Sequence, residues 1–399
     1  MKKIKVVRIF SRLNIGGPSL HVVLLSEYLS SAYETILVTG RVDVQEGDMS
    51  YLLRDQKKYR HVFIPELGRS IHFWRDFVAF YKLVKLLMNE KPDIVHTHTA
   101  KAGALGRLAA VIARVPIRIH TFHGHTFNGY FNPFKTFIII GIEKILAYFT
   151  THIIAIGLRQ KEDLVTHYKI ASKNKVVMIP LGFDLSSFVE SSTNSLKVKQ
   201  QFQLPINKYM VGIIGRLVPI KNHALFLRVV QNMSRVRQDV HFVIVGDGQC
   251  SPFIKEQIQT MGIESHCSLL GWQKELKPIY DILDIVCLTS LNEGTPVSLI
   301  EAQACGKVVI ATDVGSVRDI VFSGQNGHVV SLNDEAGFTH ILLALLDNPE
   351  MRQKMGEHGR KFVLNNFGKE KLLREIDALY SKLLGLPQAY NKGSLFEQV

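Results

Sequence analysis

Short apolar runs rich in β-branched residues alternate with helical patterns along nearly the whole chain, and this alternation restricts the fold more than any other feature. In the first half the runs are IKVVRIF (4–10), DIVHTH (93–98), IRIHTFH (117–123) and HIIAI (152–156). They lack the regular polar alternation of a half-exposed strand, which predicts parallel strands covered on both faces. The chain is therefore expected to be an α/β protein.

The pattern lapses over residues 181–207, which are polar and serine-rich, and then a second series begins. Its strand-like runs are residues 209–215, 240–248, 267–271, 285–290, 308–312 and 328–330. A chain of 399 residues is also too long for one ordinary domain. We therefore expect two Rossmann-like, doubly wound parallel-sheet domains, at 1–181 and 182–367, with a helix within 368–399. The apolar stripe from Leu372 to Leu384 needs a partner, either the first domain or a second copy of the chain.

The net positive charge is confined to the first half. Residues 1–180 hold 26 Lys and Arg against 13 Asp and Glu, whereas residues 181–399 hold 22 of each. Such a half attracts anionic surfaces, which include lipid headgroups, nucleic acid and anionic substrates, although plain solubilising charge is an alternative. The four cysteines form no C-x-x-C pair, no signal peptide is visible, and no apolar run reaches the roughly 20 residues of a membrane span. We expect a cytoplasmic protein, with peripheral membrane contact left open.

Two stretches of the second half carry charged residues at predicted carboxyl ends of strands. GRLVPIKNH (215–223) supplies Arg216 and Lys221, a pair of cations suited to a diphosphate. EGTPVSLIE (293–301) places Glu293 on a turn and Glu301 more than one turn into a helix. Amides of residues 294–297 between these carboxylates could face an anion or sugar hydroxyls, so a nucleoside diphosphate sugar fits the arrangement. Solvated surface charge and helix capping are the alternatives.

Two stretches of the first half lie at similar positions. Gly16 and Gly17 follow the first strand and permit close approach of a ligand, although a plain tight turn would look the same. HTH (96–98) and HTFHGH (120–125) place five histidines at strand ends. No cysteine or carboxylate accompanies them at ligand spacing, so we expect hydrogen-bonding histidines, one of them toward substrate, and no metal.

Some enzyme classes lack support in the sequence. The chain has no G-x-x-x-x-G-K-[ST], no Asp-x-Asp and no G-x-S-x-G. Phosphoryl transfer on a P-loop and a serine nucleophile on a strand-to-helix turn are therefore not indicated. A diphosphate would have to be neutralised by Arg216, Lys221 and helix amides.

The motifs together resemble the family 4 retaining glycosyltransferases of GT-B fold that build bacterial surface polysaccharides. The resemblance rests on Gly16-Gly17, HTHTAKAGALGRLAA, HTFHGHTF, GRLVPIKNH, VGDGQ, LLGW and EGTPVSLIEAQACGKVVIATDVGSVRDIV, and covers about residues 1–385. It implies two domains facing across a cleft, with the last helix returning to the N-terminal domain. It also implies an N-terminal domain for the acceptor and a C-terminal domain for the donor.

The resemblance also implies roles for single residues. Arg216 and Lys221 would hold the donor diphosphate, Glu301 the ribose hydroxyls, and Glu293 the donor sugar. His123 would contact the sugar, with His120 and His125 close enough to leave that choice open. The remaining donor-binding positions are Gly16, Gly17, Gly271, Trp272, Gly294, Thr295, Pro296 and Val297. Transfer would retain configuration by a front-face path without cofactor or metal, the leaving phosphate oxygen helping to deprotonate the acceptor.

The acceptor is indicated less directly. Residues 127–149 are rich in aromatics and poor in charge, and the basic KKYR (57–60) adds to the positive half. Both features suit contact with an anionic membrane and a lipid-linked or oligosaccharide acceptor, whereas a buried core helix at 135–149 is the alternative. A UDP-linked donor is favoured by analogy only. A UDP-N-acetylglucosamine 2-epimerase of the same fold and a non-catalytic nucleotide-sugar or nucleic-acid binder are rival interpretations, although dispersed Lys and Arg disfavour nucleic acid.

Overall fold

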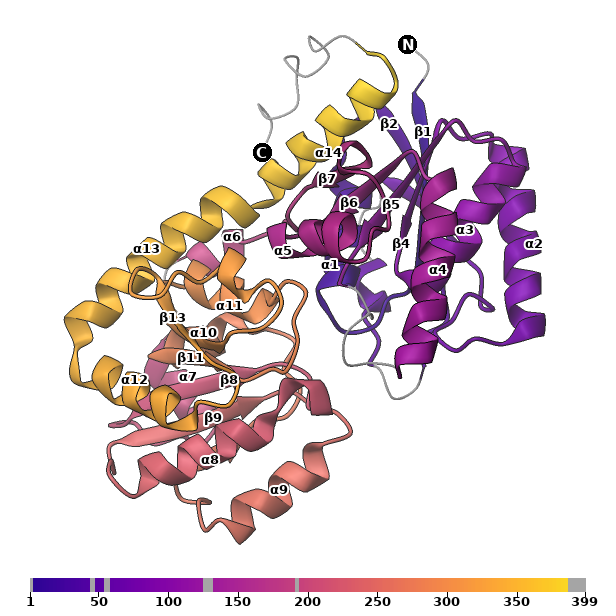
Figure 1. Cartoon of the computed structure of the whole chain (residues 1–399). Coiled ribbons are helices and arrows are strands. Elements are labelled where there is room, and N and C mark those ends of the chain that lie inside the picture. The colour runs from indigo at the N-terminus through magenta and orange to yellow at the C-terminus, as the bar shows by residue number, and fades with distance from the viewer. Residues whose placement is uncertain (1–2, 44–46, 54–57, 125–131, 191–193, 387–399) are drawn as a thin grey trace. The chain divides into compact units, whose positions relative to one another are not determined.

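The computed structural model describes residues 3–43, 47–53, 58–124, 132–190 and 194–386. The chain forms two compact units (Figure 1). Unit 1 comprises Met1–Phe183 together with Lys369–Val399, and unit 2 comprises Asp184–Gly368. Unit 2 is thus inserted between two parts of unit 1.

Unit 1 is built on a seven-stranded parallel sheet with the order β3-β2-β1-β4-β5-β6-β7. Its strands are β1 (Ile4–Arg12), β2 (Tyr33–Gly40), β3 (Tyr59–Phe63), β4 (Ile94–His98), β5 (Ile117–Phe122), β6 (His152–Ala155) and β7 (Val176–Met178). Its α-helices are α1 (Gly17–Tyr28), α2 (Phe73–Glu90), α3 (Ala100–Ile112), α4 (Pro133–Phe149), α5 (Leu158–Glu162) and α14 (Lys369–Leu383).

The helices of unit 1 cover both faces of its sheet. Helices α2 and α3 pack over Val7, Ile9 and Val95 on one face. Helices α1 and α14 pack over Val6 and Ile94 on the other face. Neighbouring residues of one strand therefore enter different cores, which explains why these strands are apolar without alternation.

Unit 2 repeats this plan with a six-stranded parallel sheet of order β10-β9-β8-β11-β12-β13. Its strands are β8 (Tyr209–Ile214), β9 (Val240–Val245), β10 (Cys267–Leu269), β11 (Ile285–Leu288), β12 (Val308–Thr312) and β13 (Gly327–Val330). Its α-helices are α6 (Ser186–Val189), α7 (Ser195–Gln201), α8 (His223–Ser234), α9 (Ser251–Thr260), α10 (Lys277–Ile282), α11 (Val297–Ala304), α12 (Glu335–Asp347) and α13 (Pro349–Phe367).

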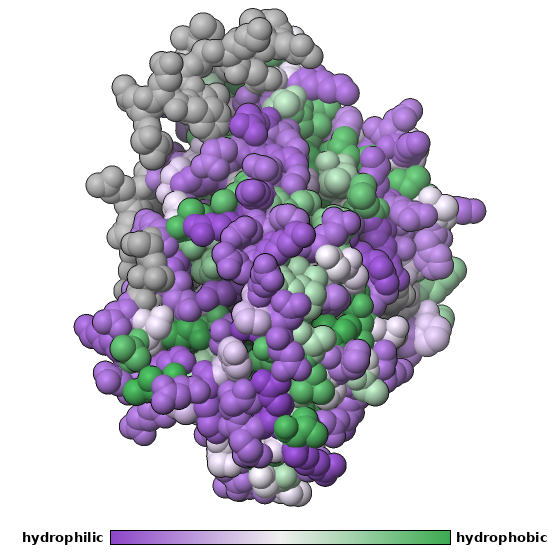
Figure 2. Space-filling view, turned by 90° about the vertical axis from the view of Figure 1, so that its left-hand side faces the viewer, coloured by the Kyte–Doolittle hydropathy of each residue, from purple (hydrophilic) through white to green (hydrophobic). Residues whose placement is uncertain are grey.

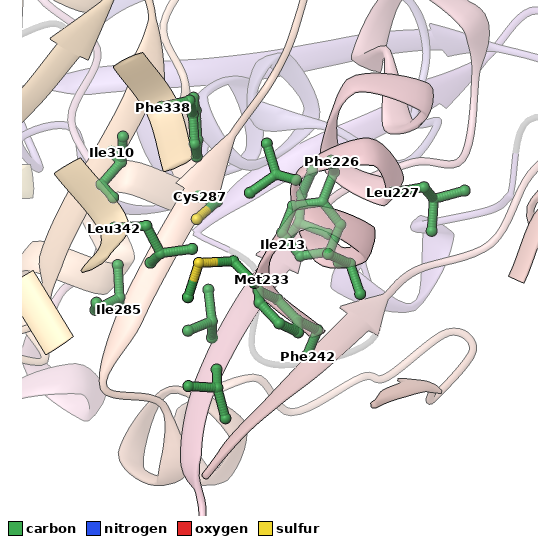
Figure 3. Packing of buried hydrophobic residues seen from close by; sticks show 14 of the residues in the cluster. Ile213, Phe226, Leu227, Met233, Phe242, Ile285, Cys287, Ile310, Phe338 and Leu342 are labelled. Carbon is green, nitrogen blue, oxygen red and sulfur yellow. The ribbon is translucent and has the colours of Figure 1, made fainter. Parts of the chain in front are cut away.

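The main core of unit 2 lies between the sheet and helices α8, α9, α12 and α13 (Figure 3). Phe226 and Met233 of α8 meet Phe242 of β9 and Phe338 of α12 in this core. Cys287 is buried here as a free thiol, like Cys267. Dense apolar packing fixes the sheet from which the loops at its carboxyl edge project.

The predicted fold class is confirmed: two Rossmann-like parallel sheets follow one another along the chain. The last helix, α14, returns to unit 1, where Leu372, Ile376 and Leu379 join the core beside α1. Tyr33 donates a hydrogen bond of 2.7 Å to Asp377 and fixes this packing. The apolar stripe of the C-terminal helix therefore has an intramolecular partner.

Hydrophobic side chains are spread over the surface in Figure 2 as small patches among hydrophilic ones. Among the described residues, none of the helices combines the length and apolar character needed to cross a bilayer.

Candidate functional site

The loops that follow the strands of unit 2 are tied to one another at the carboxyl edge of its sheet. Gly215 donates a backbone hydrogen bond to Val245, and Gly246 donates one to Gly271. The backbone amide of Leu291 donates to Ile220. The sequence motifs around residues 216–221, 271–272 and 293–301 thus share one edge, where parallel α/β sheets bind ligands.

Lys221 and Glu293 form an ion pair at this edge. The Lys221 Nζ–Glu293 Oε1 distance is 2.5 Å, and Ser290 donates a 2.6 Å hydrogen bond to the same oxygen. The ammonium group has three donors, so it can keep this contact and also hold an anion. The ion pair joins the two motifs and fixes the orientation of the Glu293 carboxylate.

Arg216 lies directly after β8 and Gly215 and is partly buried. Its guanidinium has no hydrogen bond or ion pair with another residue of the described chain. The guanidinium group of Arg216, whose N–H donors have no protein partner among the described residues, is suited to bind a phosphate group.

The loop of residues 294–297 leads into α11. Pro296 is the N-cap residue and has an extended backbone. Helix α11 starts at Val297 and has no side-chain cap, so its first amides keep their capacity to donate. The Thr295 hydroxyl is also buried without a partner among the described residues. Unmet donors at a helix N-terminus suit an anion or sugar hydroxyls.

Glu301 lies on the first turns of α11, away from the ion pair of Glu293. The single hydroxyl hydrogen of Tyr280 in α10 is shared between Glu301 Oε2 at 2.9 Å and the Ser298 carbonyl oxygen at 3.1 Å. Burial raises the pKa of Glu301 to about 7, an effect that the tyrosine hydrogen bond partly offsets. Tyr280 thus fixes one oxygen, whereas Oε1 receives no hydrogen bond from the described residues and can accept one from a ligand hydroxyl.

The base-binding candidates Gly271 and Trp272 follow β10. Gly271 has φ of +67°, a conformation that favours glycine. The Trp272 side chain is 46% exposed. Its aromatic surface is therefore open at the edge that carries Arg216.

Gly315, which the sequence analysis did not single out, supports the Glu293 loop. It has φ of +51°, and a Cβ atom there would lie 1.8 Å from the Glu293 carbonyl oxygen. Only glycine lets the loop after β12 approach this closely. A single glycine in the sequence DVGS does not indicate such a contact, so the role of Gly315 was not predictable from the sequence.

In unit 1, Gly16 and Gly17 lie where β1 gives way to α1. Gly16 is the N-cap, has φ of +152°, and is followed by Gly17 as the first helical residue and by Pro18. Ser19 donates a 2.5 Å hydrogen bond to the Asn14 carbonyl and closes the turn. This helix start has neither an acidic residue nor a side-chain cap, so it is open to an anion.

His123 follows β5 and meets His98, the last residue of β4. His98 Nδ1 and His123 Nε2 are 2.9 Å apart, and His21 of α1 contacts both rings edge-on. Burial lowers the pKa of His123 to about 3, so the ring is neutral near pH 7. A neutral imidazole with one nitrogen fixed by His98 can donate to or accept from a substrate hydroxyl.

His120 occupies a different position. It is 1% exposed, its Nδ1 lies 2.9 Å from Thr97 Oγ1, and its ring packs where a Cβ on Gly103 would collide. His120 is thus part of the packing between β5 and α3. His125 lies outside the described residues. The structure places His123, of the two described candidates, at the strand end.

Three histidines of unit 1 lie close enough to be considered as a metal site. Ligand atoms of His21, His98 and His123 lie within 4.8 Å of one another. His98 and His123 already bond each other. Burial is the main cause that lowers the pKa of His21 and of His98, and the positive charge of the buried Arg8 guanidinium adds to it. The three imidazoles form a ligand set without a carboxylate, and a buried arginine, Arg8, lies near them.

A buried polar array continues from this cluster into unit 1. His96 stacks on His98, and its Nδ1 lies 3.0 Å from Arg8 Nη1 and 2.6 Å from the Tyr380 hydroxyl of α14. Thr121 lies 2.7 Å from His96 Nε2. Histidines at 96 and 98 therefore orient one another and, through His98, His123.

Comparisons with known proteins give the same class as the site. The chain matches the family models "Glycosyltransferase Family 4" over residues 15–187 and "Glycosyl transferases group 1" over residues 195–362. It is 32% identical, over 84% of its length and 87% of the relative's, to an Escherichia coli UDP-Gal:α-D-GlcNAc-diphosphoundecaprenol α-1,3-galactosyltransferase. A Staphylococcus aureus capsular polysaccharide glycosyltransferase, CapM, is 27% identical over 86% of this chain and 90% of its own.

Solved structures show the same fold at lower identity. Anabaena HepE in complex with UDP superposes with a TM-score of 0.80 at 19% identity, covering 96% of this chain and 100% of HepE. Sucrose-phosphate synthase from Thermosynechococcus elongatus gives a TM-score of 0.79 at 18% identity, with coverage of 96% and 100%.

Two Rossmann-like parallel-sheet units and the likeness to these solved structures define the GT-B fold. The chain belongs to glycosyltransferase family 4 and is a hexosyltransferase that uses a nucleotide-sugar donor. The epimerase and binding-protein alternatives are not favoured, because these relatives are named as transferases.

Proposed function

We propose that the protein transfers a hexose or N-acetylhexosamine from a UDP-sugar to a lipid-linked saccharide during synthesis of a surface polysaccharide. The observation that carries the proposal is the edge of unit 2, where Arg216, the Lys221–Glu293 pair and Glu301 occur together. The donor is inferred from the UDP named for HepE and the UDP-Gal of the E. coli relative. The acceptor is inferred from that relative's GlcNAc-diphosphoundecaprenol.

Each part of the donor then has a partner in unit 2. Arg216 and Lys221 bind the diphosphate, with the amides of Gly294 to Val297 at the start of α11. Glu301 accepts hydrogen bonds from the ribose, and Glu293 accepts them from the sugar. Gly271 and Trp272 flank the base.

Unit 1 supplies the remaining groups. Gly16 and Gly17 present the start of α1 to the diphosphate, and His123 contacts the transferred sugar as a neutral donor. We assign unit 1 to the acceptor, since it holds all of the net positive charge, and unit 2 to the donor. A lipid-linked acceptor would place the enzyme peripherally on the cytoplasmic side of a membrane.

The reaction proposed for these groups retains configuration. The bond from the anomeric carbon to the diphosphate oxygen breaks, and the acceptor oxygen attacks from the same face. The acceptor proton passes to the leaving diphosphate oxygen, whose growing charge Arg216 and Lys221 stabilise. The scheme uses no metal, since these two cations and the helix amides neutralise the diphosphate.

The test is a donor panel with purified full-length protein. UDP-, GDP- and ADP-sugars are incubated with a GlcNAc-diphospho-lipid, and free nucleotide and product are followed by mass spectrometry with and without EDTA. We expect release of UDP that requires the acceptor and survives EDTA, with an α-configured product by NMR. We also expect Arg216→Ala to reduce turnover at least ~100-fold, the loss typical of a group that stabilises developing charge.

Other outcomes separate the parts of the proposal. Loss of turnover in EDTA that Zn²⁺ or Mg²⁺ restores would overturn metal independence. Transfer only from GDP- or ADP-sugars would overturn the donor. Conversion of UDP-N-acetylglucosamine alone into UDP-N-acetylmannosamine, with no product on the acceptor, would point back to the epimerase interpretation.

A further inference from the structure

Helix α2 is apolar on two opposite sides. Ala79, Leu83 and Leu87 are fully buried against the sheet of unit 1. On the other side, at spacings of three or four residues, lie aromatic side chains that are 59–76% exposed: Phe73, Trp74, Phe77 and Tyr81. An outward row of aromatics is not needed for packing α2 on its sheet.

Helix α4 repeats this arrangement. Its buried side is formed by Glu143, Leu146 and Ala147. Its outward side carries apolar residues that are 62–80% exposed: Phe134, Phe137, Ile145 and Tyr148. The alternative of a buried core helix at 135–149 is therefore wrong for most of this segment, because only a narrow strip of α4 contacts the unit.

The two rows belong to one surface. Helix α3 packs against both α2 and α4 and lies between them (Figure 1). Leu108 and Ile112 of α3 are 39% and 54% exposed. We call the outward sides of α2, α3 and α4 the outer face of unit 1. Helices this close are about 10 Å apart, so the two aromatic rows are roughly 20 Å apart.

The segment that carries the outer face has an excess of positive charge, although its Arg107 is buried and its Lys82 is paired with Glu66. Residues 69–149 hold eleven Lys and Arg against four Asp and Glu. All four acids are engaged within unit 1: Asp76 with Lys101, Glu90 with Lys5, Asp93 with the Lys5 amide, and Glu143 with Arg107. At 3.6 residues per turn, Lys135 and Lys144 fall on the two borders of the α4 row.

The aromatics lie toward the functional end of unit 1. Helices that connect parallel strands begin at the carboxyl edge of the sheet, so α2 and α4 start at the edge where His98 and His123 lie. Phe73, Trp74 and Phe134 are in the first turns of their helices. The outer face thus reaches the histidine end of the sheet.

We propose that the outer face of unit 1 is a monotopic docking surface for an anionic lipid bilayer. Aromatic side chains enter the headgroup region, and the lysines at the borders contact anionic headgroups. A second copy of this chain is a poorer occupant, because pairing two outer faces would bring like charges together. The inference rests on the proposed lipid-linked acceptor, whose reactive end lies at such a surface.

Tryptophan fluorescence gives a direct test. The chain contains two tryptophans, so Trp272→Phe leaves Trp74 as the single reporter. Vesicles of phosphatidylglycerol and phosphatidylethanolamine should shift its emission to the blue, and lipids brominated near the headgroup should quench it. Pure phosphatidylcholine should give a weaker signal, and salt should reduce binding to the anionic vesicles.

Flotation of the full-length protein with the same vesicles tests the residues. We expect Trp74→Ser/Phe77→Ser/Phe137→Ser to reduce the partition coefficient at least tenfold. Val236→Ser/Phe253→Ser, which removes side chains of unit 2 that are 62% and 47% exposed, is the matched control and should bind as the unchanged protein does. Circular dichroism and thermal unfolding would show that both variants are folded.

Activity separates this inference from the proposed function. The triple variant should lose activity on acceptor in vesicles and keep it on a short-chain, water-soluble acceptor analogue. If the unchanged protein transfers sugar but does not float, and Trp272→Phe shows no shift of Trp74 emission, the docking surface is overturned and the transferase stands. If sedimentation without lipid shows a dimer that the triple variant abolishes, the occupant is a second copy. Equal flotation of the triple variant and the control would also overturn the proposal.

Discussion

The Glu301 carboxyl is held in surroundings that favour its protonated form in the ligand-free protein. Its pKa in the folded chain, raised to about 7 by burial, lies above the 4.5 of an ordinary glutamate. The associated stability is therefore fully present below pH 4.5 and is lost as the pH rises through 7. The ribose hydrogen bonds that we propose for Glu301 would offset this cost when the donor binds.

Glu301→Gln should accordingly stabilise the ligand-free protein and weaken donor binding. Removing the ionisable group should raise the unfolding free energy of unit 2 at pH 8 by up to about 3 kcal/mol, with little effect at pH 4.5. The measurement is urea unfolding at the two pH values. A variant equally destabilised at both would show that Glu301 is a structural hydrogen-bond acceptor only.

Donor binding should also depend on pH through this residue. Calorimetry with UDP-glucose, whose diphosphate does not titrate near neutrality, should give affinity about tenfold weaker at pH 6 than at pH 8. Ligand hydroxyls favour the ionised acid, so binding strengthens as the pH rises through 7. Glu301→Gln should bind weakly with no such change between the two pH values.

Single residues differed in how far the sequence revealed them. Arg216, Lys221, Glu293 and Glu301 were predictable as a set, since charged groups at strand ends of a parallel sheet meet at one edge. The Lys221–Glu293 pair and the Tyr280 contact to Glu301 were not, because they join residues 72 and 21 positions apart. Spacing along the chain does not specify such rotamers.

Among the elements, the loop of Glu293 is positioned by its neighbour after β12. Gly315→Ala should place a methyl group against the Glu293 carbonyl and displace the carboxylate. A displacement of about 1 Å in a substrate-positioning group can lower turnover by roughly 100-fold. The measurement is kcat and KM for donor, with KM for UDP-sugar expected to rise.

A matched control distinguishes this effect from the general cost of alanine at positive φ. Gly262 has φ of +66°, and a methyl group added there would have nothing within 4 Å. Gly262→Ala should carry the same backbone cost of about 1 kcal/mol and leave turnover unchanged. Similar kinetics for both variants would contradict the role assigned to Gly315.

The elements themselves were predictable to different degrees. The buried strands were evident from continuous apolar runs such as residues 240–248, and β9 is buried throughout. The exposure of α4 was not evident, because Ile, Phe and Leu at 134–149 suit a core helix as well as a surface one. Only the positions of β5, β6 and α3 decide which side of α4 remains uncovered.

For the whole molecule, the buried histidines predict that acid destabilises unit 1 more than unit 2. Burial lowers the pKa of five of them: His21, His96, His98, His120 and His123. Because an unfolded histidine titrates near 6.5, each contributes stability above that pH. The contribution is lost, at up to about 1.4 kcal/mol per pH unit, as the pH falls below about 6.5. In unit 2, burial lowers the pKa of His223 and His241, so these residues also reduce stability as the pH falls. The raised pKa of Glu301 has the opposite effect, because it increases stability as the pH falls.

The stability of each unit can be measured by urea titration at pH 7 and at pH 5. At each urea concentration a deuterium pulse at one fixed pH labels unfolded segments, and mass spectrometry of peptides assigns the labelling to unit 1 or unit 2. Peptides from β4 and β5 should report a midpoint that falls strongly at pH 5, and peptides from β8 and β11 a smaller change. An equal shift in both units would contradict the prediction.

The return of α14 to unit 1 has a consequence for synthesis on the ribosome. The core beside α1 includes Leu372, Ile376 and Tyr380, which emerge after every residue of unit 2. Unit 2 is one continuous segment and can fold as soon as it leaves the exit tunnel. Unit 1 cannot complete its core until α14 is made, so part of one face of its sheet stays exposed until then. The part made first is therefore completed last, and a nascent chain stalled before residue 369 would expose that apolar face to chaperones and proteases.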